Sequence, residues 1–330
     1  MLLDALLSNE QNKAALVRLG ADGRLPHAII LEGERGSGRF TLARLISAMA
    51  VCRRSGAGCG ECPDCKMALE GQHPDVEVFA KSGGQGTLTI KSLRTINQSV
   101  ATPPNQGRRR VVILRDIQDI AQARTLNTLL KVIEEPPEYL MFIITVDNRE
   151  NLLPTILSRC LLLRMELPSP EECAGRVQEL LKGGADAQEA GRSEEALRMA
   201  RLCGGNIGRT AQLLSDTPEA RVMADALALS KALIGHERYA VLRLLQRYER
   251  DRVGYRELLC DLRVVFSQLV EQKYQPQDEE LSALSQRLTA LQGIKILDII
   301  DDMSRTGQFN LNLPLTLTRL GARLTGAVLG

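Results

Sequence analysis

One stretch near the N-terminus constrains the fold more than any other: Leu-Glu-Gly-Glu-Arg-Gly-Ser-Gly-Arg-Phe-Thr at positions 31–41. It follows the apolar run 28–31 and precedes the helix-like sequence 42–46, so it is predicted to form a strand, a glycine-rich turn and the start of a helix. That order is the context of a phosphate-binding loop, which reads G-x-x-x-x-G-K-[ST].

The loop departs from this pattern at the positions that carry its chemistry. Gly33, Gly36 and Gly38 supply the glycines, but Arg39 stands at the position of the lysine and Phe40 at that of the metal-binding hydroxyl. Arginine keeps the charge as a rigid fork instead of a compact point charge, and phenylalanine cannot ligate a metal. We therefore expect a nucleotide pocket of degenerate type that does not hydrolyse ATP.

Composition is that of a soluble globular protein whose 330 residues suggest two or three domains. Lysine and arginine number 42 against 40 acidic residues, a balance that neither requires nor excludes a nucleic-acid partner. The absence of Trp, with five Tyr and five Phe, leaves few platforms for stacking bases. No signal-peptide core and no apolar run near the roughly 18 residues of a membrane span are found, so we expect a cytoplasmic protein.

Four of the eight cysteines are bunched directly after the first predicted helix, at Cys52, Cys59, Cys62 and Cys65. Two overlapping C-x-x-C pairs can close around one ion, and a glycine-bearing loop brings the first cysteine back as a fourth thiolate, which suits tetrahedral Zn²⁺. The alternatives are small buried hydrophobic residues or a redox pair, and His73 is a less favoured ligand. Four thiolates leave no open position on the metal, so we expect a structural zinc site without catalysis.

A second core strand is predicted at 111–117, and a third at 140–146, with helical patterns between them. This alternation indicates an α/β domain with a parallel sheet. In ATPases of this type the second strand ends in Asp-Glu, where the aspartate holds Mg²⁺ and the glutamate prepares the attacking water. Asp116 is present, but Ile117 stands where the glutamate would be and accepts no proton.

Two groups of arginines have structural interpretations that need no special function. Arg108-Arg109-Arg110 before the second strand can contact phosphate, although three arginines at that place are more often a solvated edge. Arg159, near the end of a short helix predicted at 152–160, can be a helix-end cation that complements the macrodipole.

Taken in order, the altered loop, the four-cysteine insert, the sequence Leu-Leu-Lys-Val-Ile-Glu-Glu-Pro-Pro at 129–137 and Ser158-Arg159-Cys160 resemble the clamp-loader subunits of bacterial DNA polymerase III. The resemblance covers about residues 9–215. Within that family it is similar to the delta-prime type, which has lost the lysine and the Asp-Glu pair. The resemblance implies an AAA+ module of three parts: an α/β domain at 1–165 with the zinc module at 52–65, a helical lid at 166–216 hinged at 168–170, and an all-α collar at 217–330.

The resemblance also implies roles for particular residues. Arg159, supported by Ser158, would project as an arginine finger into the ATP site of a neighbouring subunit and stabilise charge in the transition state. Arg209, in Gly-Gly-Asn-Ile-Gly-Arg at 204–209, matches the position that reads nucleotide in the lid, but with Arg39 and Phe40 in the pocket the favoured role is lid packing alone. Thr145 occupies the sensor-1 region.

The function implied is that of a stator in a hetero-pentamer with the gamma/tau ATPase subunits and a delta subunit, which places a sliding clamp on primed DNA. One alternative is an active gamma/tau-like ATPase that tolerates Arg39 and uses Thr41 as its metal hydroxyl. Another is a zinc-containing nucleic-acid adaptor that uses Arg53, Arg54 and Lys66 on phosphate.

Overall fold

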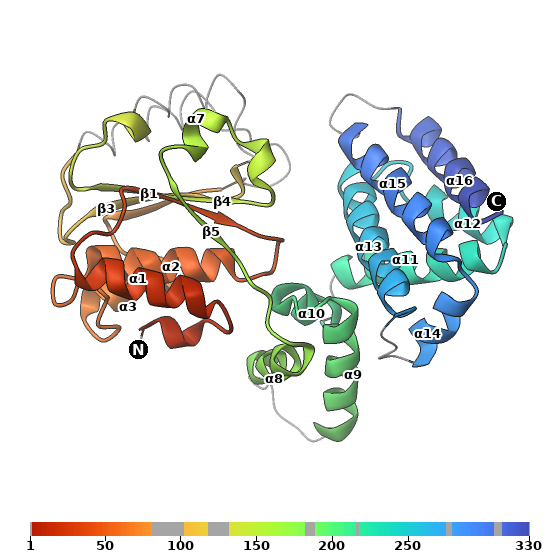
Figure 1. Ribbon diagram of the computed structural model, residues 1–330, viewed down its shortest axis with the longest axis horizontal. Coiled ribbons are helices and arrows are strands. Elements are labelled where there is room, and N and C mark those ends of the chain that lie inside the picture. The colour runs from red at the N-terminus through yellow and green to blue at the C-terminus, as the bar shows by residue number, and fades with distance from the viewer. Residues whose placement is uncertain are drawn as a thin grey trace. The chain divides into compact units, whose positions relative to one another are not determined.

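A computed structural model describes residues 2–80, 102–117, 132–181, 189–215, 218–274, 279–306 and 312–329. The chain divides into two compact units, Met1–Pro168 and Ser169–Gly330 (Figure 1). Within the described ranges, none of the helices combines the length and the hydrophobicity that crossing a membrane requires.

The first unit is built on a five-stranded sheet in which every pairing is parallel, as the sequence predicts. Its strand order is β2-β3-β4-β1-β5. The strands are β1 (Ala28–Glu32), β2 (Val76–Phe79), β3 (Arg110–Leu114), β4 (Leu140–Val146) and β5 (Leu161–Arg164). The sequence analysis predicted β1, β3 and β4, but not the two edge strands, which are only four residues long.

Alternation along the strands divides the core of this unit between the two faces of the sheet. Ile29, Leu31 and Ile143 point into a cluster with the helices, whereas Ile30 and Ile144 point into a second cluster. Figure 1 shows α1 (Glu10–Ala21), α2 (Arg39–Val51) and α3 (Pro63–Glu70) on one face and α7 (Pro154–Leu157) on the other. Short 3-10 helices lie at Leu2–Ala5 and Arg149–Asn151.

The chain leaves this unit along a segment that Asn9 holds in place. Its side-chain amide donates to the Glu166 carbonyl at 2.9 Å, and its Oδ1 accepts from the Glu166 backbone N–H at 2.8 Å. Asn9 is 1% exposed and has φ 64°, a left-handed conformation that asparagine tolerates better than most residues. The start of α1 is thereby fixed to the end of the unit.

The second unit is helical and contains two hydrophobic clusters. The smaller cluster, centred on Cys173, Val177 and Ala200, lies inside the region predicted as a lid. The larger one includes Leu229, Phe266 and Leu320 and lies mostly in the region predicted as a collar. The helices are α8 (Pro170–Leu181), α9 (Glu189–Leu202), α10 (Ile207–Leu213), α11 (Pro218–Ile234), α12 (Arg238–Gln246), α13 (Arg252–Glu271), α14 (Glu279–Gln286), α15 (Ala290–Thr306) and α16 (Leu313–Leu329).

Residues 169–330 form one compact unit, so the division into a lid and a collar stays a prediction. The helix predicted over 121–135 lies largely outside the described residues, although 132–134 are helical. The glycine loop at 83–86 and the helix predicted to begin at 90 lie wholly outside them.

Candidate functional site

The strand, turn and helix predicted around the glycine-rich loop are present. β1 ends at Glu32 and α2 begins at Arg39, and Gly36 and Gly38 have φ values of 86° and 91°. A Cβ on Gly33 would lie 2.8 Å from Cβ of Met165, so only glycine fits beside that side chain. The loop therefore has the backbone context of a phosphate-binding loop.

Arg39, the first residue of α2, is buried beside this loop and lies between two carboxylates. Its side chain is 5% exposed, and Nη2 lies 3.1 Å from Oδ1 of Asp116 and 2.7 Å from Oδ1 of Asp147. The two acids follow the carboxyl ends of β3 and β4. These ends lie on the same side of the parallel sheet as the loop after β1. Its positive charge is thus balanced from within the chain.

Asp147 is a pocket residue that the sequence analysis missed. The sequence does contain an indication of this role. Asp147 directly follows β4, and the carboxyl ends of parallel strands lie on the same side of a sheet. The sequence could not predict that the guanidinium of Arg39 lies beside the carboxylate of Asp147.

Asp116 itself is engaged on both its backbone and its side chain. Its N–H donates to Thr145 Oγ1 at 2.8 Å, and Thr145 Oγ1 lies 3.4 Å from Asp116 Oδ1. The next residue, Ile117, is 1% exposed and packs in the hydrophobic cluster on the second face of the sheet. The position that would hold a water-activating glutamate is therefore part of the core.

An aromatic ring occupies the position of the metal-binding hydroxyl. The guanidinium groups of Arg44 and Arg115 lie 4.7 Å and 4.5 Å from the centroid of the Phe40 ring, within range of cation–π attraction. Thr41, the hydroxyl that the active-ATPase alternative requires, is exposed to solvent. Ser37 is 7% exposed, and its Oγ is buried without a hydrogen-bond partner in the described structure.

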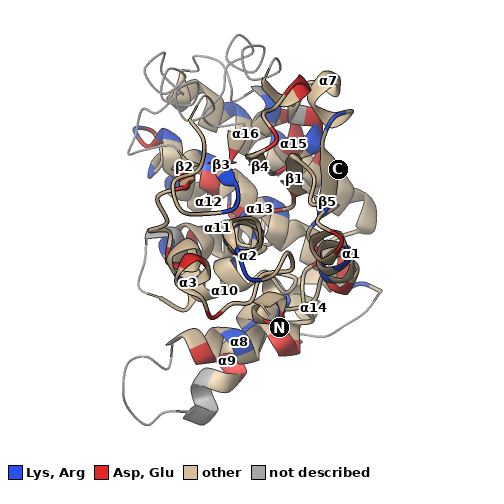
Figure 2. Cartoon of the chain, turned by 90° about the vertical axis from the view of Figure 1, so that its left-hand side faces the viewer, with Lys and Arg blue, Asp and Glu red and all other residues tan. Residues whose placement is uncertain are grey.

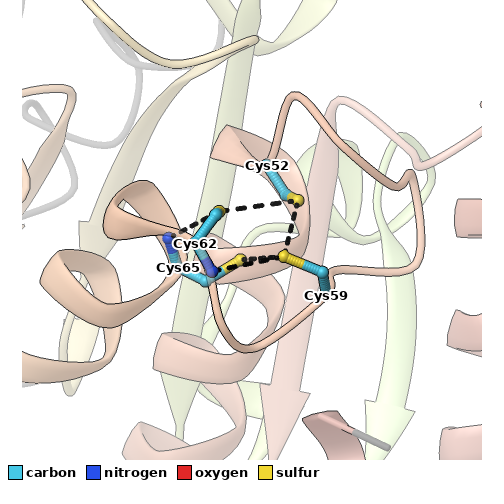
Figure 3. A group of neighbouring side chains, drawn as sticks. All are labelled: Cys52, Cys59, Cys62 and Cys65. Carbon is cyan, nitrogen blue, oxygen red and sulfur yellow. Dashed lines mark hydrogen bonds between the residues drawn. The ribbon is translucent and has the colours of Figure 1, made fainter.

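The four bunched cysteines converge as the sequence predicts (Figure 3). Their sulfurs all lie within 4.8 Å of one another, with Cys52 to Cys59 at 3.7 Å, Cys59 to Cys65 at 3.9 Å and Cys52 to Cys62 at 4.0 Å. A tetrahedral ion with Zn–S bonds of about 2.3 Å separates its sulfurs by roughly 3.8 Å. The donor set and its spacing therefore fit Zn²⁺.

Backbone N–H groups orient three of these sulfurs. Ser55, Cys62 and Cys65 donate to the sulfurs of Cys52, Cys59 and Cys62 respectively, each at 3.4 Å. Backbone hydrogen bonds from Glu61 and Cys62 lower the pKa of Cys59 to about 6. Burial raises the pKa of Cys62 and of Cys65. A metal would have to bind the buried pair as thiolates, and its binding would release protons.

His73 does not belong to the group of four sulfurs. It is 3% exposed, its Nδ1 accepts from the Asp75 N–H at 3.0 Å, and its Nε2 lies 3.7 Å from Oδ1 of Asp64. These contacts make it a buried structural histidine beside the cysteine loop.

Two of the three arginines at 108–110 have partners inside the unit. Arg109 donates to the Leu25 carbonyl at 2.8 Å, and Arg110 lies 2.6 Å from Oε1 of Glu77. Beside the cysteine loop, Arg53 lies 3.3 Å from Oδ2 of Asp64. Figure 2 shows acidic and basic residues interspersed over the described part of the chain. These local pairings weaken the case for a phosphate-binding surface here.

Arg159 lies on the turn that ends α7 and is exposed. Its Nη1 donates to the Thr155 carbonyl at 3.0 Å and to Ser158 Oγ at 3.2 Å. Its Nη2 lies 3.2 Å from Oε1 of Glu134. The contact with a carbonyl of its own helix is what a helix-end cation makes.

Arg159 and the glycine-rich loop lie at opposite ends of the parallel strands. Leu161, the first residue of β5, is next to Ile29 near the start of β1, whereas the loop follows the end of β1 at Glu32. At about 3.3 Å per residue, the four steps from Ile29 to Gly33 correspond to about 13 Å. Arg159 therefore lies near the end of the strands opposite the glycine-rich loop of its own chain.

Arg209 is engaged within the second unit. Its Nη2 contacts Oδ1 of Asp261 on α13, and the two side chains are 19% and 10% exposed. The side chain of Asn206 caps α10 by accepting from the Arg209 N–H at 3.1 Å. This geometry is what a packing role requires.

Comparison with known proteins finds one family model, several curated relatives and several solved structures that are similar to this chain. Residues 8–169 match the family described as DNA polymerase III, delta subunit. The delta-prime subunit of DNA polymerase III from Yersinia pestis is 31% identical over 160 residues, 48% of this chain and 47% of that protein. The tau/gamma subunit from Haemophilus influenzae is 34% identical over 143 residues, 42% of this chain and 20% of that protein.

The matched part of the chain spans about half the length of the delta-prime relatives and less of the tau/gamma relatives. Among solved structures, a DNA polymerase III gamma-subunit-related protein from Thermotoga maritima aligns over 97% of this chain and 99% of its own, with 18% identity and a TM-score of 0.46. A likeness at that level supports no conclusion on function.

Proposed function

Since residues 8–169 match the DNA polymerase III delta-subunit family, we propose that the chain is a non-hydrolysing AAA+ subunit of delta-prime type in a cytoplasmic sliding-clamp loader. It would act as a stator in a hetero-pentamer with gamma/tau ATPase subunits and a delta subunit. The partner subunits would use ATP to place a clamp on primed DNA, and this chain would supply Arg159 to one of their sites.

The observation that carries the non-hydrolysing role is the pairing of the buried Arg39 with Asp116 and Asp147. In a working site the lysine is free for the phosphates and the aspartate for Mg²⁺. Here Arg39 is 5% exposed and pairs with Asp116 and Asp147, which are 21% and 39% exposed, so the cation and the aspartate neutralise each other. Phe40 and Ile117 supply neither a metal ligand nor a base.

The trans role of Arg159 is supported by its exposure and by its position near the end of the strands opposite the glycine-rich loop of its own chain. A guanidinium binds phosphate oxygens in bidentate fashion and stays charged at any physiological pH. Placed against the γ-phosphate of a neighbour's ATP, it would stabilise charge in the transition state.

We assign the four cysteines a structural role. Zn²⁺ held by Cys52, Cys59, Cys62 and Cys65 would cross-link the end of α2 to the start of α3. With four thiolates no position remains for a water molecule, so no catalytic step is assigned to this site.

The test compares ATP turnover of a reconstituted loader containing this chain with loaders containing Arg159→Ala or Arg159→Lys. Arginine fingers contribute about 10³–10⁵ in rate. We therefore expect turnover at the contacted site to collapse in both variants, while assembly measured by size-exclusion chromatography is unchanged. Arg149→Ala, an exposed arginine on the preceding short helix, is the matched control. Full turnover with Arg159→Ala would overturn the trans role.

The identity with tau/gamma subunits favours a second candidate, an active ATPase of that type. It predicts ATP turnover by the isolated chain that Asp116→Ala abolishes. Under the proposed function, the isolated chain has no turnover for this substitution to remove.

A further inference from the structure

The guanidinium of Arg159 is held from two sides, and one of the groups that hold it is distant in sequence. Nη1 is bound by Thr155 and Ser158 in its own turn. Nη2 is bound by Glu134, which belongs to the helical segment 132–134 that precedes β4. The orientation of the arginine therefore depends on a second element of the unit.

Stability alone does not account for the contact with Glu134. The Arg159 and Glu134 side chains are 40% and 41% exposed. Ion pairs this exposed contribute about 0–1 kcal/mol to folding, because water screens the charges and both side chains lose rotamer freedom. The contact nevertheless biases a long side chain toward one orientation, which is the effect that a positioning role requires.

We propose that Glu134 is a positioning residue for Arg159. It holds the guanidinium at the surface in the orientation in which it meets a phosphate group of nucleotide bound by a neighbouring subunit. A guanidinium has five N–H donors, and the three contacts described leave donors for an incoming phosphate oxygen. The inference rests on the proposed trans role of Arg159 and deepens it.

The first test is Glu134→Gln in the reconstituted loader, a change that keeps the size of the side chain and removes its charge. A contact worth about 0–1 kcal/mol changes the population of the correctly oriented guanidinium by at most about 5-fold, so we expect a loss of kcat of about 2- to 5-fold at the contacted site. The KM for ATP should stay the same, because Glu134 itself touches no nucleotide. Glu135→Gln, the exposed neighbour, is the matched control and should retain full turnover.

A double-variant comparison separates positioning from an independent effect. If Glu134 acts through Arg159, Glu134→Gln should lower turnover in the native background and have no further effect in Arg159→Ala. Additive losses would mean that Glu134 acts elsewhere, and higher turnover with Glu134→Gln would mean that it competes with nucleotide for the arginine. Either result overturns the inference.

The outcomes also separate this inference from the proposed function. If Arg159→Ala has no effect, the trans role itself fails. If Arg159→Ala lowers turnover and Glu134→Gln does not, only the positioning role of Glu134 fails. Assembly and thermal unfolding of both variants are measured alongside, so that a folding defect is not taken for a loss of positioning.

Discussion

Asp75 is a charged side chain in the interior of the first unit whose carboxylate has hydrogen-bond donors at close range. It is 0% exposed and accepts backbone N–H bonds from Asn105 at 2.6 Å, Gln106 at 2.8 Å and Gly107 at 2.7 Å. Burial by itself would raise the pKa of Asp75, but the three donors outweigh it, so the pKa is lowered from its ordinary value. The carboxylate thus fixes the loop that leads into β3.

For Asp75→Asn we expect a loss of unfolding free energy of about 1–3 kcal/mol at pH 7, because an amide cannot accept all three bonds and a buried donor loses its partner. Urea unfolding measures the loss, with the exposed Asp22→Asn as control. Equal unfolding midpoints for the two variants would contradict this account.

The native protein and the Asp75→Asn variant should also differ in their response to acid. Because the folded-state pKa of Asp75 is lowered, its stabilisation is fully present above the unfolded-state pKa near 3.9 and is lost as pH falls through the folded-state value. Between pH 7 and pH 3 the native protein should therefore lose more unfolding free energy than Asp75→Asn. A constant difference between them across that range would exclude this linkage.

At the scale of elements, the cysteine loop ties the end of α2 to the start of α3. Cys52 follows the last residue of α2, and Cys62 caps α3 by accepting from the Cys65 N–H. The two helices also pack on the same face of the sheet (Figure 1). A metal there would stabilise the loop between them more than the unit as a whole.

Cys62→Ser isolates the metal from the cap, because serine is itself a good helix N-cap. We expect zinc content, measured by elemental analysis of purified protein, to fall from one ion per chain, with metal affinity reduced by more than about 100-fold. Proteolysis within the loop at 53–61 should become faster. Cys260→Ser, on α13 outside the cluster, should retain the ion. A native protein purified without zinc would refute the assignment.

At the scale of the whole molecule, one ion pair joins the predicted lid to the predicted collar. Arg209 comes from α10 and Asp261 from α13, and both side chains are mostly buried. The Arg263–Asp301 pair uses the same helix but is 55% and 39% exposed. The two pairs therefore form a natural comparison of buried and exposed salt bridges.

Double-mutant cycles with alanine should give a coupling of about 1.5–3 kcal/mol for Arg209 and Asp261, and about 0–1 kcal/mol for Arg263 and Asp301. Chemical unfolding of the full chain provides the free energies. A coupling near zero for Arg209 would argue against a packing role and return the residue to the nucleotide-reading role that the family resemblance implies.

The sequence by itself determined the features that depend on neighbours along the chain. The order of apolar run, glycines and helix start predicted β1, the loop and α2, and the spacing of four cysteines predicted their convergence. Turn chemistry and ligand spacing act over a few residues, so the sequence contains them directly. The substitutions at Arg39, Phe40 and Ile117 could likewise be read without a structure.

Only the tertiary structure decided which distant side chains meet. Asp147 beside Arg39, Glu134 beside Arg159 and Asp261 beside Arg209 are pairings between separate elements. The sequence analysis also missed the edge strands β2 and β5, because runs of only four residues are hard to distinguish from loop or helix segments by their pattern. A side chain pairs with whatever the packed elements bring within a few ångströms, and that set is fixed by strand order and helix packing, which a linear pattern does not contain.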